Sequence, residues 1–164
     1  MYLETIDRFS DLAEKKAGLV NDNPFSFFVG AMMAGAYVGM GILLIFSLGG
    51  QVDTSVRPIV MGVSFGIALT LVVFAGSELF TGLIMTMAFG WLRNKVGLGD
   101  VFYALGFCWL GNLVGAVLIA SLFAAGGGGA LFGASADLLN GVASSKMDRS
   151  PIELFCLAIL CKGG

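Results

Sequence analysis

Charged residues divide the sequence into long apolar stretches separated by short polar connections. The first uncharged stretch runs for thirty residues, from Asn23 to Val52, and its Asn-Pro start predicts that a helix begins at residue 24. A membrane-spanning helix needs about 20 apolar residues. The pattern therefore predicts a first span over residues 24–49.

The second apolar stretch, residues 58–92, is about twice as long as one straight crossing requires. It contains a single charged residue, Glu78, within the glycine-bearing sequence GSELFTG of residues 76–82. Glycine and serine make a continuous helix unfavourable at this point. We therefore expect a second span that is broken in two near residue 78.

A third apolar stretch covers residues 101–125 and ends at the four consecutive glycines 126–129. Each of these would cost a helix about 1 kcal/mol relative to alanine, so we expect a third span followed by a loop of about twenty residues. Residues 150–153, with the sequence SPIE, combine a serine N-cap, a proline at the first helical position and a capping-box glutamate. Residues 151–162 are too short to cross a core about 30 Å thick, and we interpret them as the truncated start of a fourth span.

The first twenty residues show a different pattern. Apolar side chains recur at helical spacing, at Tyr2, Ile6, Phe9, Ala13 and Ala17. Charged residues occupy most of the other positions, which predicts an amphipathic helix over residues 1–20 that lies in the membrane interface. The alternative is a polar helix packed on the inner face of the protein itself, and neither arrangement changes the expected function.

The composition excludes several classes of protein. Hydrophobic residues make up 57% of the 164 residues and charged residues only 12%, against roughly 25% charged in soluble domains. We therefore expect one all-α membrane domain over residues 1–164. The absence of histidine, and three cysteines without metal-ligand partners, argue against zinc sites and enzymatic catalysis, and no cofactor is expected. The net charge of −2 argues against nucleic acid as a partner.

Basic residues in the short flanks of the spans indicate an orientation. Five lie on the side of the amino terminus, at Arg8, Lys15, Lys16, Arg93 and Lys95. Three lie on the other side, at Arg57, Lys146 and Arg149. This bias favours a cytoplasmic amino terminus.

The break in the second span carries the candidate chemistry. Backbone groups exposed at membrane depth cost several kcal/mol each unless they face protein or a wet cavity. A half-helix that starts near Phe80 or Thr81 would point unpaired N–H groups and a positive dipole end into such a cavity, and both favour an anion. The other residues of the broken-helix loop are Gly76, Ser77, Glu78 and Gly82. In the alternative interpretation, residues 76–78 merely form and cap a turn, with the carboxylate accepting from the same N–H groups.

A helix dipole alone cannot move an anion through lipid. A helix end contributes about 0.3–2 kcal/mol, whereas an ion taken out of water loses on the order of 20 kcal/mol. Passage needs retained water, further donors or transient protonation of a weak acid, and the Thr81 hydroxyl is the side chain best placed to donate. Phe65, Leu69 and Leu79 would form narrow apolar constrictions, or else contact lipid or other helices.

Small residues recur every four positions in the first span, at Ala31, Gly35 and Gly39, and in the third, at Gly111 and Gly115. This spacing predicts close approach of two helices. Asn112 lies between the last two, and we expect it to be an interhelical hydrogen-bond partner rather than a pore group.

Several of these segments resemble one known family. VFAGSELFTG (73–82) is similar to the signature of the formate/nitrite transporter family. AGAYVGMG (34–41), the sequence of residues 55–82 and WLGNLVGA (109–116) are most similar to its nitrite channel branch. The resemblance implies an aquaporin-like bundle of six helices in two inverted repeats, assembled as a homopentamer with one pore for small monovalent anions in each subunit. This chain corresponds to the first repeat and the start of a fourth helix.

The resemblance also implies roles for individual residues. Leu79, Phe80 and Thr81 match the loop of the broken helix, Leu69 together with Leu79 matches the cytoplasmic constriction, and Phe65 matches the periplasmic one. Members of the family place a histidine opposite the threonine, on the second repeat, and no residue here can supply it.

The hypothesis from sequence is transmembrane transport of nitrite, with formate next, in the cell inner (plasma) membrane. The alternative is a non-conducting truncated fragment of such a channel.

Overall fold

The computed structural model describes residues 2–128, 133 and 135–163. The regular structure of these residues consists of the helices α1 (Tyr2–Asp22), α2 (Pro24–Gly49), α3 (Arg57–Phe74), α4 (Phe80–Leu92), α5 (Leu98–Ala125), α7 (Ser135–Met147) and α8 (Pro151–Gly163). Three of them, α2, α3 and α5, are long and apolar enough to cross a membrane. The expected class, an all-α membrane protein, is confirmed.

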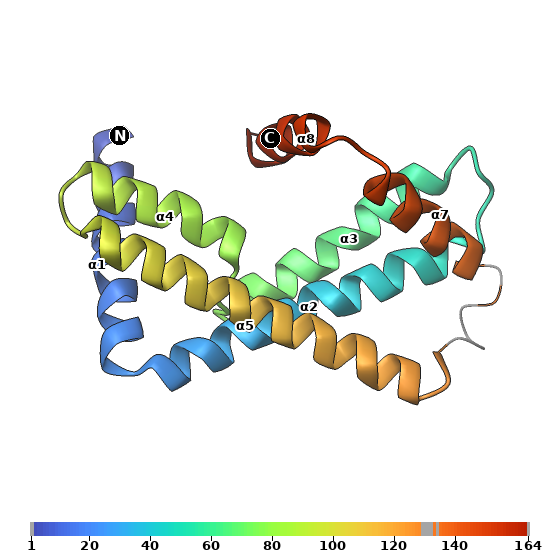
Figure 1. Ribbon diagram of the computed structural model, residues 1–164, viewed down its shortest axis with the longest axis horizontal. Helices are drawn as coiled ribbons and strands as arrows, with labels where there is room; N and C mark the ends of the chain where they lie inside the picture. Colours follow the sequence, from blue (N-terminus) through green and yellow to red (C-terminus); the bar gives the residue numbers. More distant parts are fainter. Residues whose placement is uncertain (1, 129–132, 134, 164) are drawn as a thin grey trace.

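Two long helices form the centre of the molecule. α2 and α5 cross near their midpoints, so that the pair has the shape of an X (Figure 1). α3 lies along the second half of α2, and α4 lies against α5 on the opposite side of the crossing (Figure 1). The connection from α3 to α4 therefore passes close to the crossing itself.

The crossing is close because glycines replace side chains there. A Cβ atom on Gly35 would overlap the backbone of Asn112, and one on Gly115 would overlap the carbonyl of Met32. On Gly111 it would lie 2.5 Å from the Cβ of Ala31. The prediction of close helix approach from the four-residue spacing is confirmed.

α1 packs its small residues against α4. Ala13 is completely buried, and a Cβ atom on Gly90 would overlap it. The Ser10 hydroxyl donates to the carbonyl of Phe89, 3.2 Å away. The Phe9 and Phe89 rings stack with their centroids 5.9 Å apart. The apolar face of α1 is therefore covered by protein, and its position in a membrane interface stays a prediction.

The charged face of α1 pairs with the connection that follows α4. Arg93 binds Asp7 at 2.7 Å, and Lys95 binds Asp11 at 3.2 Å and Glu14 at 3.3 Å. These contacts bring the amino-terminal helix and residues 93–95 to the same end of the molecule, as the charge pattern of the sequence requires.

The ends of several helices follow the sequence signals. The Asn23 side chain caps α2 by accepting from the N–H of Ser26 at 3.1 Å. α5 ends at Ala125 with Gly126 as its C-cap, and Gly127 has a φ of +79° that favours glycine. Ser150 and Glu153 form the expected capping box at the start of α8. Gly129, the last glycine of the predicted stop, lies outside the described residues.

The expectation of a loop between the third span and residue 150 is wrong, because α7 occupies residues 135–147. Ser, Gly and Asn make this segment a poor helix on propensity alone. Leu139, Val142 and Ala143 recur at helical spacing and face a cavity beside α2. Packing against α2 therefore outweighs local propensity, as it does for most helices in proteins.

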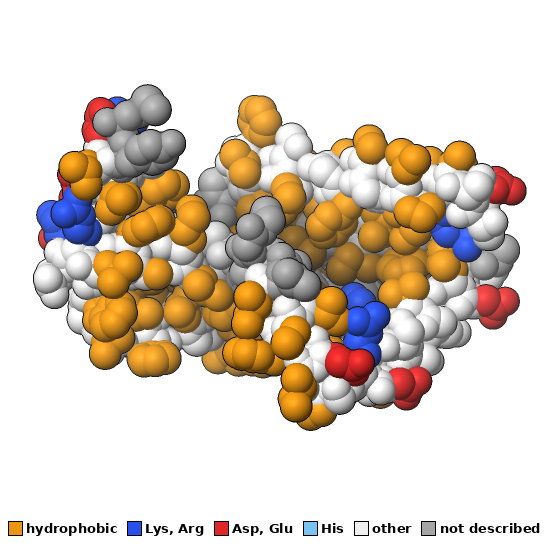
Figure 2. Space-filling model, turned by 90° about the horizontal axis from the view of Figure 1, so that it is seen from above, with side chains coloured by type: hydrophobic (Ala, Val, Ile, Leu, Met, Phe, Trp, Pro, Cys, Tyr) orange, Lys and Arg blue, Asp and Glu red, His pale blue; other side chains and the backbone are white. Residues whose placement is uncertain are grey.

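Most apolar side chains of the three span candidates are exposed. Val63 and Phe74 of α3, for example, are 75% and 88% exposed. Hydrophobic side chains gather over much of the face seen in Figure 2. Such a surface has to be covered by lipid or by further protein.

Candidate functional site

The helical hydrogen-bond pattern is interrupted between the end of α3 at Phe74 and the start of α4 at Phe80. Gly76 has a φ of +62°, in the left-handed region that glycine adopts without strain. Its N–H donates to the carbonyl of Val73 at 3.1 Å, and the N–H of Ser77 donates to that of Val72 at 3.0 Å. This pair of bonds is a Schellman motif, which ends α3 and satisfies its last carbonyls.

Asn112 of α5 ties the connection to the helix crossing. Its Oδ1 atom accepts from the N–H of Phe80 at 3.0 Å, and its Nδ2 atom donates to the carbonyls of Ala31 at 2.8 Å and Glu78 at 2.9 Å. The N–H of Glu78 donates in turn to the carbonyl of Gly30 at 3.2 Å. Asn112 thus bridges α2, α5 and the connection, which confirms the prediction of an interhelical partner.

The first turn of α4 leaves two backbone donors unpaired. Among the described residues, the N–H groups of Thr81 and Gly82 have no hydrogen-bond partner, whereas the N–H of Leu83 bonds to the carbonyl of Leu79 at 3.0 Å. Both Thr81 and Gly82 are exposed. Unpaired N–H groups at a helix start carry the positive end of the helix dipole, so this turn can accept an anion.

Glu78 does not cap α4. Its carboxylate forms an ion pair with the Lys16 ammonium of α1, and the two side chains are 13% and 19% exposed. Leu79 is the N-cap residue and provides no side-chain hydrogen bond. The alternative in which Glu78 accepts from the first N–H groups of α4 is therefore not what the described residues show. The Ser77 hydroxyl beside it is buried and has no hydrogen-bond partner in this part of the chain.

Two cavities meet at the connection. One, of about 670 Å³, lies between α1, α3 and α4, and its lining includes Leu69, Gly76, Ser77, Glu78, Leu79 and Gly82, together with Lys16. The other, of about 270 Å³, lies between α2 and α5, and its lining includes Leu79, Phe80, Thr81, Trp109 and Asn112. Leu79 lines both cavities. The structure thus gathers eight of the nine site residues proposed from sequence around one point; their role in a pathway stays a prediction.

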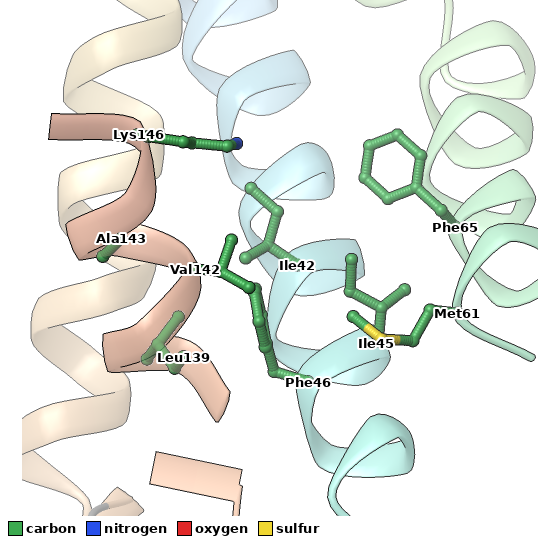
Figure 3. Close-up of a pocket in the computed structure, with 9 residues that line it drawn as sticks. All are labelled: Ile42, Ile45, Phe46, Met61, Phe65, Leu139, Val142, Ala143 and Lys146. Atoms are coloured by element: carbon green, nitrogen blue, oxygen red, sulfur yellow. The ribbon is translucent and has the colours of Figure 1, made fainter. Parts of the chain in front are cut away.

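The ninth residue, Phe65, lies apart from the others. It lines a cavity of about 510 Å³ between α2, α3 and α7. Figure 3 shows Lys146 of α7 extending into this space from the side opposite Phe65, with Ile42 of α2 between them. The remaining lining is apolar, so Lys146 supplies the only formal charge among these lining residues.

Sequence reasoning did not propose Lys146 or Lys16 for the site. Lys146 fell in the expected loop, although its spacing from Leu139 and Val142 places the three side chains on one helical face. Lys16 was counted only for orientation. In the described residues no group of three His, Cys, Asp or Glu side chains could hold a metal ion.

Comparison with known proteins connects this geometry to one family. The sequence model of the family described as formate/nitrite transporter matches residues 3–162. The chain is 46% identical over 161 residues to the nitrite transporter NirC of Escherichia coli (strain K12), an alignment that covers 98% of this chain and 60% of the relative. It is 45% identical over the same length to NirC of Salmonella typhimurium, with the same shares covered.

A solved structure agrees with these matches. A chain described as an FNT family ion channel is similar with a TM-score of 0.74 and 51% sequence identity, over 77% of this chain and 51% of that chain. The chain described here therefore spans about 60% of the length of the curated relatives it matches and about half of the matched structure.

Proposed function

This chain belongs to the formate/nitrite transporter family, and from that premise we propose that it forms part of a pathway through which small monovalent anions cross a membrane. Its relatives are transporters and channels and not enzymes, in agreement with the expectation from sequence. Nitrite is the anion we favour and formate the next, because the NirC transporters are 45–46% identical to this chain.

The observation that carries the proposal is the pair of unpaired N–H groups on Thr81 and Gly82. The neighbouring backbone N–H groups have acceptors: that of Phe80 donates to the Asn112 side chain, and that of Glu78 donates to the carbonyl of Gly30 on α2. Two donors left without a partner beside these largely apolar cavities are costly unless water or a ligand binds them. Because they sit at the positive end of α4, a negatively charged ligand is the favoured one.

The neighbouring side chains complete the proposed pathway. The Thr81 hydroxyl adds a donor at the cavity between α2 and α5. Leu69 and Leu79 both line the cavity between α1, α3 and α4, and together they form the cytoplasmic constriction. Phe65 forms the outer constriction. Lys146, which lines the same cavity as Phe65, raises the local concentration of anions.

We also propose the assembly and placement that the family resemblance implies. The assembly is a homopentamer with one pore in each subunit. The protein lies in the inner membrane, with its amino terminus on the cytoplasmic side. The ion pairs of Arg93 and Lys95 with α1 support this orientation, because they hold the basic residues of both segments at one end of the molecule.

Flux measurements in liposomes test the proposal. The purified chain, reconstituted in liposomes, should pass nitrite and formate faster than protein-free liposomes do, and Thr81→Val should lower the rate because a donor is removed. Thr70→Val is the matched control, since Thr70 is exposed on α3 and its hydroxyl donates to the carbonyl of Gly66 at 2.9 Å. A chain that passes neither anion contradicts the proposal, and unchanged flux in Thr81→Val removes Thr81 from the mechanism.

A further inference from the structure

A largely buried ion pair joins α1 to the connection between α3 and α4. It consists of the Lys16 ammonium and the Glu78 carboxylate, whose side chains are 19% and 13% exposed. The two residues lie 62 positions apart in the sequence. A pair at this depth needs an explanation, because burying two charges costs much of the free energy that their attraction returns.

Outside α1, the described helices around the pair place no other formal charge near it. α2 contains no charged residue, α3 has only Arg57 at its far end, and α4 has none. From α5, the titratable group at this point is the Cys108 thiol, whose Sγ atom lies 3.2 Å from the carbonyl oxygen of Glu78. Lys16 is therefore the group that balances the Glu78 charge.

Glu78 occupies a place where a carboxylate hinders the proposed function. It lines the cavity of about 670 Å³ that Gly82 also lines, and the N–H of Gly82 is one of the two unpaired donors. An unbalanced carboxylate would repel an anion that approaches these donors.

We propose that Lys16 is a positioning residue for the anion: by neutralising Glu78 it leaves the N–H groups of Thr81 and Gly82 as the charge that an entering anion meets. This inference rests on the proposed function and deepens it. It makes the two partners unequal, because loss of Lys16 leaves a negative charge in the cavity, whereas loss of Glu78 leaves a positive one. Loss of both leaves the cavity neutral again.

Fluorescence quenching of Trp109 tests the proposal without transport. Trp109 lines the cavity that Thr81 lines, and Trp91 is the only other tryptophan of the sequence, so Trp91→Phe isolates its signal. In this background we measure the ratio of quenching by iodide to quenching by neutral acrylamide. Lys16→Met should lower this ratio about tenfold, which corresponds to about 1.4 kcal/mol of repulsion. Lys16→Arg and the double variant K16M/E78Q should keep the iodide-to-acrylamide ratio of the parent, whereas Glu78→Gln, which leaves the Lys16 charge unbalanced, should raise it.

A purely structural role for the pair predicts a different pattern. Lys16→Met and Glu78→Gln would then both change quenching by acrylamide, and the double variant would not restore the parental ratio. Lys15→Met is the matched control, because Lys15 is the exposed neighbour on α1. The proposal is overturned if Lys16→Met keeps the parental ratio, or if the double variant is as impaired as Lys16→Met.

Nitrite flux in liposomes provides a second measurement on the same Lys16 and Glu78 variants. Lys16→Met should lower the flux by about tenfold, and K16M/E78Q should recover it. A parent chain without flux contradicts the proposed function, and the iodide ratio then still decides the role of Lys16. A conducting parent with equal flux and equal iodide ratio in Lys16→Met overturns the role of Lys16 and leaves the proposed function standing.

Discussion

The side-chain oxygen of Asn112 lies 3.0 Å from the backbone nitrogen of Phe80, so the middle of α5 supplies the acceptor for the first N–H of α4. The amide nitrogen of the same side chain donates to one carbonyl on α2 and to one in the connection. One residue thus fixes where α4 begins.

Replacing Asn112 should destabilise the protein strongly. Asn112→Leu removes three hydrogen bonds, one from the N–H of Phe80 and one each to the carbonyls of Ala31 and Glu78, and each contributes about 0.5–1.5 kcal/mol. We expect the free energy of unfolding to fall by about 2–4 kcal/mol in detergent micelles. Asn140→Leu, at an exposed position of α7, should change it by less than about 0.5 kcal/mol. Equal stability of the two variants would show that the three bonds contribute little.

A larger residue at the helix crossing should separate α2 from α5. A Cβ atom on Gly115 would overlap the carbonyl of Met32, so Gly115→Leu should lower the free energy of unfolding by about 3 kcal/mol. Gly106 lies on the same helix with no atom near its Cβ position. Gly106→Ala should therefore raise stability by about 0.5–1 kcal/mol. Thermal denaturation followed by circular dichroism compares the two variants, and a stable Gly115→Leu would contradict the close crossing.

Packing, and not charge, should hold α1 on α4. Ala13 is fully buried against Gly90, so Ala13→Leu should detach α1 and speed hydrogen exchange of its backbone amides. Lys95→Gln should change this exchange only slightly, because exposed ion pairs contribute little.

The pH dependence of the same contacts follows from their charges. Hydrogen bonds from Lys95 to Asp11 and then to Glu14 raise the pKa of Lys95 above its ordinary 10.5. A raised pKa means that the contribution is complete below pH 10.5 and is lost as the pH rises through the raised value. Hydrogen exchange of α1 in the parent should therefore show no effect of Lys95 titration between pH 6 and pH 9. A marked step in that interval, absent in Lys95→Gln, would contradict the assignment.

Lys146 should increase anion flux through electrostatic attraction. It is the only formal charge among the residues that line the cavity with Phe65, so Lys146→Gln should lower nitrite flux several-fold at low ionic strength. The difference from the parent should shrink in high salt, because salt screens attraction at a distance. Lys15→Gln, on the exposed face of α1, serves as the control. A flux unaffected by Lys146→Gln at any salt concentration would remove Lys146 from the pathway.

The bounds of the apolar helices and the interruption between residues 74 and 80 could be predicted from sequence because membrane crossing constrains length and charge so strongly. Residues 24–49 match α2 in full, and α3 and α4 fall within one residue of the outer limits expected for the broken span, 58–92. Asn112 could also be predicted as a bridge, since an amide among small residues at depth needs a partner.

The contacts between distant segments could not be predicted in the same way. The pairing of Lys16 with Glu78 depends on how α1 folds back over α4, which no local pattern specifies. α7 escaped prediction because its helix depends on packing against α2 and its own sequence favours helix weakly. Phe65 was expected at a constriction on the opposite side of the break from Leu69 and Leu79, and the cavity that it lines with α2 and α7 is visible only in the fold.

The glycine contacts at the crossing of α2 and α5 limit how the molecule can move. With backbone against backbone at Gly35 and Gly115, neither helix can slide past the other without a steric clash. Asn112 fastens the beginning of α4 to this immobile pivot. Any rearrangement that widens the proposed route past Leu79 should therefore displace α1 or α3, which line the cavity of about 670 Å³ at that residue.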